Sequence, residues 1–227
     1  MALVGLPHPG PDNPNAAPTE SITVLRLAED GAAELVPMRW WLTPHWSREV
    51  TTRYSMFNAK SETVHKSPAF REPFRSRRCV VPVCGFYEWA RSAGHKVPYY
   101  IHPEDAPGLL LAGIWDRWRD PRSDESVESF AVLTAPANPA LSFVHTRQPV
   151  MLGFAEALQW LNPNATAEEL APLMCSLLPM GLEVLPVSSH VNNARHKDER
   201  CTQGVADPVP IAAAGSGVGP PSATRGS

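Results

Sequence analysis

The sequence lacks any run of eighteen consecutive apolar residues, and its first residues form neither a basic segment nor an apolar one. The first absence excludes a membrane-spanning helix, because about 20 apolar residues are needed to cross a bilayer. The second argues against an export signal. With 43% hydrophobic residues in a chain of 227, the composition is that of a globular protein. We expect it in the cytoplasm, associated with the nucleoid, with no membrane partner.

Cysteine is scarce and its spacing does not suit a metal site. The four cysteines include no C-x-x-C pair, and the eight histidines include no H-E-x-x-H segment. This pattern matches neither a zinc ribbon nor the disulfide framework of a small secreted domain. We therefore expect reduced thiols, no metal ion and no cofactor.

Acidic residues are depleted from one part of the chain. From Arg39 to Lys96 there are eleven Lys and Arg residues against four acids, a net charge of +7. Because the whole chain carries −3, the remainder carries −10. Such asymmetry is typical of a local anion-binding surface on an acidic body. A solvated basic face accounts for the charge equally well.

Large apolar side chains are almost absent near the C-terminal end, and prolines are frequent near the N-terminal end. Residues 206–227 are mostly Pro, Ala, Gly and Ser, which predicts a disordered tail, and the proline-rich residues 1–14 predict an irregular segment. Residues 15–205 are then the single domain. Helices are predicted over residues 155–161 and from Thr166, where Glu169 gives a capping-box spacing and apolar residues recur as far as Leu177.

Runs of β-branched and aromatic residues are frequent between these ends. They predict strands over residues 22–27, 35–41, 79–83, 98–102, 109–115, 130–134 and 182–187. Many strands, few helices and twenty-five prolines place the chain in the α+β class. We expect one irregular domain around a strongly bent, barrel-like and mostly antiparallel sheet, with a few peripheral helices.

Glu88 is the most informative single residue. It stands among Phe86, Tyr87 and Trp89, directly after the apolar run 80–83. A carboxyl group in such surroundings titrates high, because a low dielectric disfavours its charged form. This makes Glu88 a candidate general acid or base. The alternative is a glutamate at the rim of the core that pairs with an arginine.

Tryptophan and arginine are concentrated between residues 38 and 46. Arg39, Trp40 and Trp46 flank Pro44, and such side chains on a loop stack on unpaired bases and hold phosphate. Core packing explains one or two of the tryptophans equally well.

Two further polar segments interrupt apolar sequence. Asn58 has an amide that orients an amine or a carbonyl, and Lys60 suits a phosphate; a capping Asn and a surface Lys are the alternative. His145 follows an apolar pair and precedes Arg147, so its imidazole suits a proton shuttle. A hydrogen-bonded core histidine is the alternative.

Together, the order and spacing of these motifs resemble the SOS-response-associated peptidase family, also described as the abasic-site processing family. The resemblance is carried by Asn15-Ala16-Ala17-Pro18-Thr19, Met38-Arg39-Trp40, Asn58-Ala59-Lys60-Ser61-Glu62-Thr63, Arg77-Arg78-Cys79, Gly85-Phe86-Tyr87-Glu88-Trp89, Leu133-Thr134-Ala135, His145-Thr146-Arg147, Pro186-Val187-Ser188 and Asn192-Asn193. Members of this family bind abasic sites in single-stranded DNA and join them covalently to an N-terminal cysteine, whose α-amine forms a Schiff base and whose thiol closes a thiazolidine ring.

The resemblance implies a role for each matched residue. Asn58 would orient the reacting N-terminus or the opened sugar, Glu88 would move protons during condensation and release, and His145 would assist ring opening and Schiff-base chemistry. The residues implied in DNA contact are Pro18, Arg39, Trp40, Trp46, Lys60 and Arg147. Asn15 and Thr134 would support them. The implied partner is single-stranded DNA with abasic sites, bound by a monomer.

One departure from the family pattern concerns the first residues. The family begins Met-Cys-Gly-Arg, whereas this sequence begins Met1-Ala2-Leu3-Val4-Gly5. Two explanations stay open: the true start lies upstream, or this is a member that keeps the groove without the nucleophile. The chain as written is expected to bind abasic DNA, or to form a reversible Schiff base through the Ala2 amine. A noncatalytic single-strand binding module and a cysteine-type peptidase that uses Cys84 or Glu88 are the alternative functions.

Overall fold

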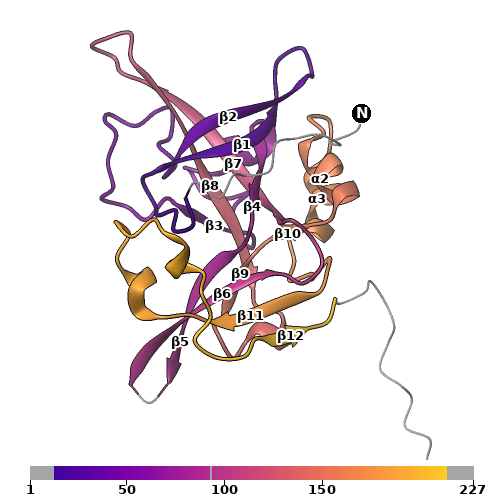
Figure 1. The fold of residues 1–227 in the computed structure, drawn as a ribbon. Coiled ribbons are helices and arrows are strands. Elements are labelled where there is room, and N and C mark those ends of the chain that lie inside the picture. The colour runs from indigo at the N-terminus through magenta and orange to yellow at the C-terminus, as the bar shows by residue number, and fades with distance from the viewer. Residues whose placement is uncertain (1–12, 93, 214–227) are drawn as a thin grey trace, which may run out of the picture.

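The structure is a computed structural model that describes residues 13–92 and 94–213. Figure 1 shows strands through most of the molecule, with short helices at the right and further helical turns at the lower left. The strands are β1 (Ser21–Leu27), β2 (Ala33–Trp40), β3 (Asn58–Lys60), β4 (Arg78–Val83), β5 (Phe86–Ser92), β6 (His95–Pro103), β7 (Leu109–Arg119), β8 (Ser126–Pro136), β9 (Arg147–Pro149), β10 (Met151–Leu152), β11 (Leu182–Pro186) and β12 (Val209–Ile211). The helices are α1 (Arg71–Ser76), α2 (Phe154–Leu161) and α3 (Ala167–Leu170), with 3-10 turns η1 (Pro139–Leu141), η2 (Ala171–Leu173), η3 (Ser189–Asn192) and η4 (Glu199–Cys201).

The larger sheet closes on itself. Its strand order is β10-β7-β4-β1-β2-β8-β3, and β7 also pairs with β8, so β7, β4, β1, β2 and β8 form a closed ring of five strands. Only the β2–β8 side of this ring is parallel, through Arg39 opposite Ser129 and Trp40 opposite Phe130. A closed ring leaves fewer strand edges open to other chains. The predicted α+β, barrel-like and mostly antiparallel fold is confirmed.

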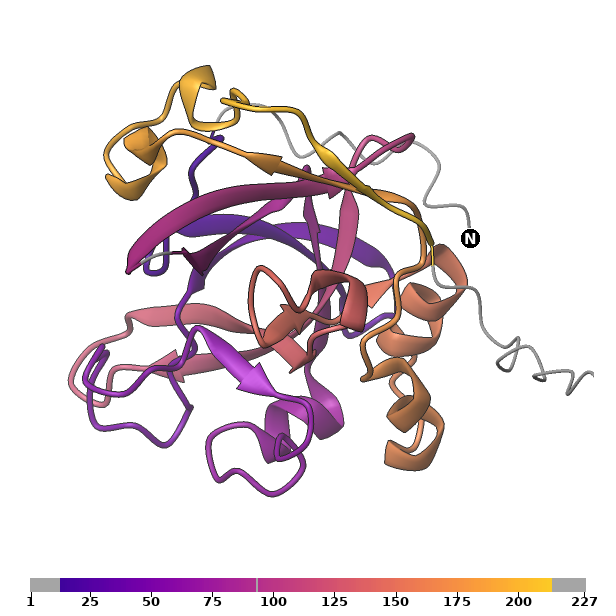
Figure 2. The same cartoon turned by 90° about the horizontal axis from the view of Figure 1, so that it is seen from below.

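A smaller sheet with the order β12-β11-β6-β5 packs against the barrel. Figure 2 shows β11 and β12 beside β6, with the η3 and η4 turns at the upper left. Ile101 and Val184 of this sheet share a buried cluster with Val24 and Val81 of the barrel. Burial of such side chains is the main favourable contribution to folding. This packing also fixes the position of β5, the strand that contains Glu88.

The helices cover a different face of the barrel. Trp160 of α2 is fully buried, and its Nε1 donates to the carbonyl oxygens of Cys79 and Gly113 at 2.9 and 3.1 Å. The capping box of Thr166 and Glu169 is present as predicted. The helix ends at Leu170 and a 3-10 turn follows, because Pro172 has no N–H to continue the hydrogen-bond pattern. Within the described ranges, no helix has the length and apolar character needed to cross a membrane.

The predicted chain ends need one correction. Residues 206–213 are part of the described structure, and β12 pairs with β11 through Ile211 opposite Leu182. The physical reason is that Ile211 is an apolar residue with only 9% of its surface exposed, so this short segment does bury apolar surface. The rest of the predicted tail, residues 214–227, and most of the irregular segment 1–14 lie outside the described residues.

Candidate proton-transfer and DNA-binding site

Glu88 lies on β5, shortly after Gly85, where the chain crosses from the larger sheet to the smaller one and runs very close to β6. A Cβ on Gly85 would come within 2.5 Å of the Ile101 carbonyl oxygen, so only glycine allows β5 to start this close to β6. Phe86 and Ala90 pack in the cluster shared with the barrel. Because side chains alternate along a strand, Glu88 faces the barrel side as they do.

The structure brings Glu88 and His145 together. Glu88 Oε2 is 3.8 Å from His145 Nδ1, although the two residues lie on β5 and on the segment before β9. Burial raises the pKa of the Glu88 carboxyl, while the nearby His145 and the hydrogen bond from the Trp89 backbone act in the opposite direction. The net direction agrees with what the aromatic neighbours predict. A carboxyl that keeps its proton to higher pH is suited to general acid catalysis.

The His145 ring is held by the backbone of Arg147. Its Nδ1 lies 3.1 Å from the Arg147 amide nitrogen and 3.1 Å from the Arg147 carbonyl oxygen. A neutral ring accepts at Nδ1 from the amide N–H, and a protonated ring donates from Nδ1 to the carbonyl or to Glu88. The same atom therefore has a partner in both protonation states. With 44% of the side chain exposed, His145 is also accessible to a ligand.

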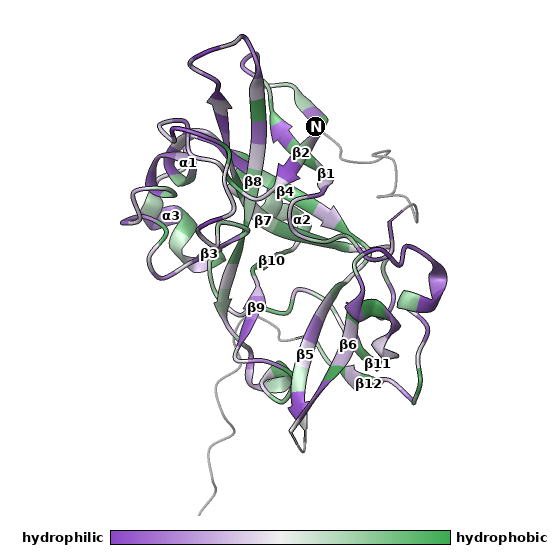
Figure 3. Ribbon diagram, turned by 90° about the vertical axis from the view of Figure 1, so that its left-hand side faces the viewer, coloured by the Kyte–Doolittle hydropathy of each residue, from purple (hydrophilic) through white to green (hydrophobic). Residues whose placement is uncertain are grey.

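Asn58 and Lys60 lie on β3, on the same face of the larger sheet. Asn58 is opposite Val132 and Lys60 is opposite Thr134, and paired residues point to one face. Val132 packs in the cluster that reaches β5, so this is the face toward Glu88. In Figure 3, β9 lies in projection between β3 and β5. Among the interactions of the described residues, none joins Asn58 directly to Glu88 or His145.

Arg147 is engaged by a carboxylate. Its Nη1 and Nη2 donate to the two oxygens of Glu62 at 2.7 and 2.9 Å, and its Nε donates to Thr134 Oγ1 at 3.1 Å. The hydrogen bonds from Arg147 lower the pKa of Glu62 to about 2. The predicted phosphate contact of Arg147 thus competes with Glu62. Thr134 contacts Arg147, so the structure brings these two predicted site residues together.

The sequence analysis assigned no role to Glu62, which the structure places in contact with Arg147. Its position two residues after Lys60 in a matched motif was the one feature that could have drawn attention to it. An exposed Glu in a basic segment is common, and nothing in the sequence says that Arg147 reaches it.

The three predicted DNA-contact residues of the tryptophan segment differ in their environments. Trp40 stacks on Phe130 and donates from Nε1 to the Phe57 carbonyl oxygen at 2.9 Å, so it serves the packing of the protein. Trp46 is 57% exposed. Arg39 is half-buried, and its buried Nη1 has no hydrogen-bond partner among the described residues. Trp46 is therefore the tryptophan of this segment that is available for stacking on a base.

The loop that presents Trp46 is fixed on both sides. The His45 amide donates to Asp116 Oδ2 at 2.9 Å, and Trp118 Nε1 donates to the Ser47 carbonyl oxygen at 2.8 Å. Asp116 is only 2% exposed, so its position is set by the core. The loop conformation is thus established before any ligand binds.

Asn15 and Pro18 belong to the segment before β1. Asn15 is buried and its Nδ2 donates to carbonyl oxygens of Val191, Asn193 and His196, so it holds the C-terminal loop. Pro18 is half-buried and precedes Thr19, whose φ of 85° is rare for a β-branched residue. This segment is pinned against the domain.

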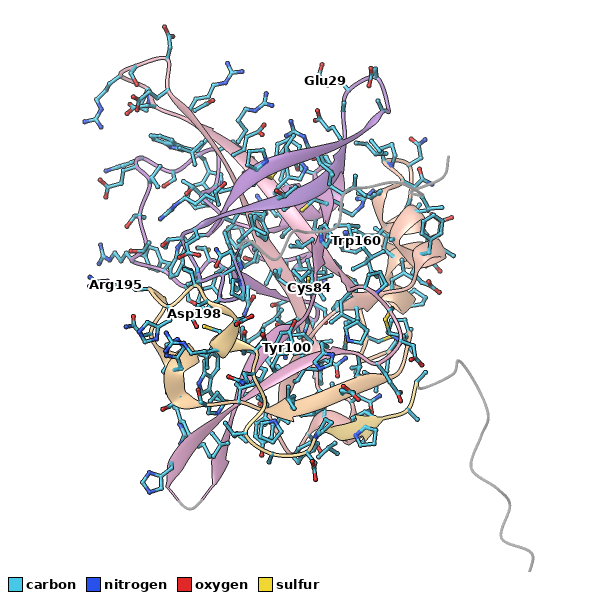
Figure 4. The ribbon with its side chains drawn as sticks, in the orientation of Figure 1. Glu29, Cys84, Tyr100, Trp160, Arg195 and Asp198 are labelled. Carbon is cyan, nitrogen blue, oxygen red and sulfur yellow. The ribbon has the colours of Figure 1, made fainter. Side chains whose placement is uncertain are left out.

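Cys84, the cysteine of the peptidase alternative, lies between β4 and β5 and is exposed. In Figure 4 it stands where the barrel meets the smaller sheet, near Tyr100. Burial and, after it, the charge of Cys84 raise the pKa of Tyr100 to about 12.

Comparison with known proteins assigns the chain to a family. The family model described as SOS response associated peptidase (SRAP) matches residues 7–194. The chain is 33% identical over 187 residues to the abasic site processing protein YoaM of Bacillus subtilis, covering 80% of each chain. It is 30% identical to the abasic site processing protein HMCES of Xenopus tropicalis, covering 77% of this chain and 58% of that protein.

A solved structure agrees with this assignment. A protein from Bacteroides thetaiotaomicron superposes with a TM-score of 0.72 at 27% identity, covering 83% of this chain and 82% of that one. From the matched motifs, the fold and these relatives, the chain belongs to the SOS response associated peptidase family.

Proposed function

We propose that this protein processes abasic sites in DNA, and that Glu88 and His145 transfer the protons. The relatives named abasic site processing proteins supply the substrate class. The observation that carries the proposal is the 3.8 Å separation of Glu88 Oε2 and His145 Nδ1, with a carboxyl pKa raised by burial. General acid and base catalysis uses two neighbouring titratable groups, of which one keeps its proton to higher pH.

The first proposed step opens the deoxyribose ring. His145 takes the proton of the hydroxyl on the anomeric carbon, a carbonyl group forms there, and the bond from this carbon to the ring oxygen breaks. The ring oxygen takes a proton from Glu88 and stays on the sugar as a hydroxyl group. Such proton transfers typically contribute about 10²- to 10⁴-fold to a rate.

The second step joins the aldehyde to an amine. His145 first gives Glu88 the proton that it took. The amine then adds to the carbonyl carbon, and Glu88 protonates the resulting hydroxyl, which leaves as water to give a protonated Schiff base. The resemblance assigns this amine to an N-terminal cysteine. The printed sequence has Ala2 at that place, and the first twelve residues lie outside the described structure. An amine that forms such an adduct is trapped on the DNA by borohydride reduction.

Binding of single-stranded DNA is the second part of the proposal. Trp46 is exposed on a fixed loop, and Lys60 is exposed on β3, on the face toward Glu88. An aromatic ring that stacks on a base and a cation that meets the backbone are the elements of single-strand recognition. Arg147 adds a second cation when a phosphate displaces Glu62. We propose that a monomer binds in this way to DNA of the nucleoid.

The test compares four oligonucleotides of one sequence: single-stranded and duplex, each intact and with one abasic site. We expect the full chain to convert the single-stranded abasic oligonucleotide to a species of lower mobility on a denaturing gel. Addition of borohydride, which reduces a Schiff base to a stable amine, should raise the yield if the adduct is reversible. Equal yields of the slower species from intact and abasic strands, with and without borohydride, would contradict the proposal.

A noncatalytic single-strand binding module is the second candidate, favoured by the exposure of Trp46 and Lys60 alone. It predicts equal affinity for intact and abasic strands and no adduct under any condition. The same four oligonucleotides therefore separate the two functions.

A further inference from the structure

The loop that follows β11 brings together three side chains that bind transition metals. His190 Nε2 is 3.1 Å from Asp198 Oδ2, and the Sγ of Cys201 completes a group whose ligand atoms all lie within 4.8 Å of one another. They come from η3 and η4, and Figure 4 labels Asp198 in this loop. One nitrogen, one oxygen and one sulfur ligand at such distances make up most of a tetrahedral coordination shell.

The loop backbone fixes each of the three ligands. Asp198 caps η4 by accepting from the Arg200 amide at 3.1 Å, and the Cys201 amide donates to the Asp198 carbonyl oxygen at 3.1 Å. The His190 ring stacks on His196 with centroids 3.8 Å apart. His196 is itself held, since its Nδ1 lies 2.8 Å from the His190 carbonyl oxygen. Ligands held by surrounding contacts bind a metal more tightly.

We propose that His190, Asp198 and Cys201 form a zinc-binding site. A tetrahedral zinc ion with bonds of about 2.0 to 2.3 Å places its ligand atoms roughly 3.3 to 3.7 Å apart. The His190–Asp198 distance is close to this, and a small shift of the Cys201 side chain completes the shell. A thiolate with imidazole and carboxylate favours zinc over magnesium or calcium, which prefer oxygen ligands.

The fourth ligand position has a route from solvent. A hollow of about 280 Å³ is lined by His190 and Arg200 together with Ser188, Gln203, Gly204 and Val205. Water or an external ligand reaches the ion from this side. Cys201 does not line this hollow and is fully buried, which would protect its bond to the metal.

Arg200 is the competitor for this site. Its Nε and Nη2 donate to the two oxygens of Asp198 at 2.9 and 3.0 Å. Its side chain is 65% exposed, so it swings away at little cost or keeps the bond to Oδ1 alone. On binding, zinc displaces the thiol proton of Cys201 to solvent, and the neutral His190 ring carries its proton on Nδ1.

The expected role of the ion is to hold the loop of η3 and η4 in place against β5. The same loop receives the Asn15 hydrogen bonds, and Asn192 Oδ1 accepts from Trp89 Nε1 at 2.7 Å. Trp89 is the neighbour of Glu88. Zinc in this loop would therefore brace the strand that carries the proposed acid, without contact to the DNA.

The test uses the full chain, free of any histidine tag. Co²⁺, which reports thiolate ligation by a near-ultraviolet charge-transfer band, and Zn²⁺, counted by mass spectrometry after dialysis, are the two probes. We expect one equivalent of zinc per chain. Zinc at 100 times its Kd should multiply the folding equilibrium constant by about 100. Cys201→Ser should abolish the cobalt band, and His190→Gln should weaken zinc binding more than about 100-fold.

Two control variants are available in the chain. Cys175→Ser removes a thiol outside the cluster, and His102→Gln disrupts a second histidine–carboxylate pair, His102 with Glu183 at 3.5 Å. Both should bind zinc as the unchanged protein does. If Cys201→Ser fails to fold, His190→Gln still decides, because His190 is only half-buried. No cobalt band in the unchanged protein, or equal zinc binding by His190→Gln, would overturn the proposal.

Discussion

Glu62 and Glu88 have opposite electrostatic surroundings. On the β3 and β9 side, the two hydrogen bonds from Arg147 lower the pKa of Glu62 to about 2. On the β5 side, burial raises the pKa of Glu88. When their environments separate the pKa values of two carboxyl groups, one stays ionised while the other can act as an acid. In the proposed mechanism, Glu62 stays charged and holds Arg147, and Glu88 exchanges protons.

The largest expected effect is on the rate of abasic-site conversion. Glu88→Gln should lower the single-turnover rate by about 10²- to 10⁴-fold, because the amide does not transfer the proton. Affinity for intact single strands should stay nearly unchanged, since proton transfer is separate from phosphate contact. Glu62→Gln is the matched control and should keep the rate within a few-fold. Equal rate losses in both variants would erase the distinction between the two carboxylates.

Replacing tryptophans should separate binding from folding. Trp46→Ala removes an exposed ring and should weaken single-strand binding by roughly 1 to 3 kcal/mol through loss of base stacking, with little change in stability. Trp40→Ala should instead lower the free energy of unfolding by roughly 3 kcal/mol, because Trp40 packs on Phe130. Fluorescence titration and denaturant unfolding measure the two quantities. A stability loss in Trp46→Ala as large as in Trp40→Ala would show that the loop tryptophan is structural.

A smaller effect concerns the salt dependence of binding on the β3 side. Lys60→Ala should lower the slope of log affinity against log salt by about 0.7, the value for one phosphate contact on a single strand. Glu62→Gln should raise the slope and the affinity, because Arg147 is then released to the DNA. Unchanged slopes in both variants would show that Lys60 and Arg147 do not contact the DNA.

The smallest effect is on stability as a function of pH. A carboxyl whose pKa is raised by folding binds more protons in the folded state, so Glu88 lowers stability progressively as pH rises above about 4.5. Relative to the unchanged protein, Glu88→Gln should therefore gain stability with rising pH. Glu62 has the opposite sign: its stabilisation is present above about 4.5 and is lost as pH falls toward about 2. Denaturant unfolding from pH 3 to 8 measures both, and parallel profiles for the two variants would be inconsistent with opposite pKa shifts.

Much of the fold was readable from the sequence, and the exceptions have physical causes. Runs of β-branched and aromatic residues located the main strands, and the aromatic neighbours of Glu88 indicated the direction of its pKa shift. β3, β5 and β9 were missed. Three residues such as Asn58–Lys60 give no periodic signal and form a strand only through pairing with β8, and in β5 the charged Glu88 interrupts the aromatic run. β12 was missed because one residue, Ile211, provides its burial.

Contacts between residues that are far apart in the sequence could not be predicted from local sequence patterns. Glu62 and Arg147 are 85 residues apart, and nothing local to either indicates their contact. The cluster of His190, Asp198 and Cys201 likewise has no familiar spacing, since two 3-10 turns bring its members together. The expectation of no metal rested on spacing alone, and the folded loop gives reason to test it.

The opposite character of the two carboxylates is tested most directly by following their titration in the folded protein. Carboxyl ¹³C chemical shifts of Glu62 and Glu88, assigned with the Gln variants, report each pKa separately. We predict a midpoint near 2 for Glu62 and one above the ordinary glutamate value for Glu88. A Glu88 midpoint at or below that of an exposed glutamate would contradict its proposed role as the proton donor.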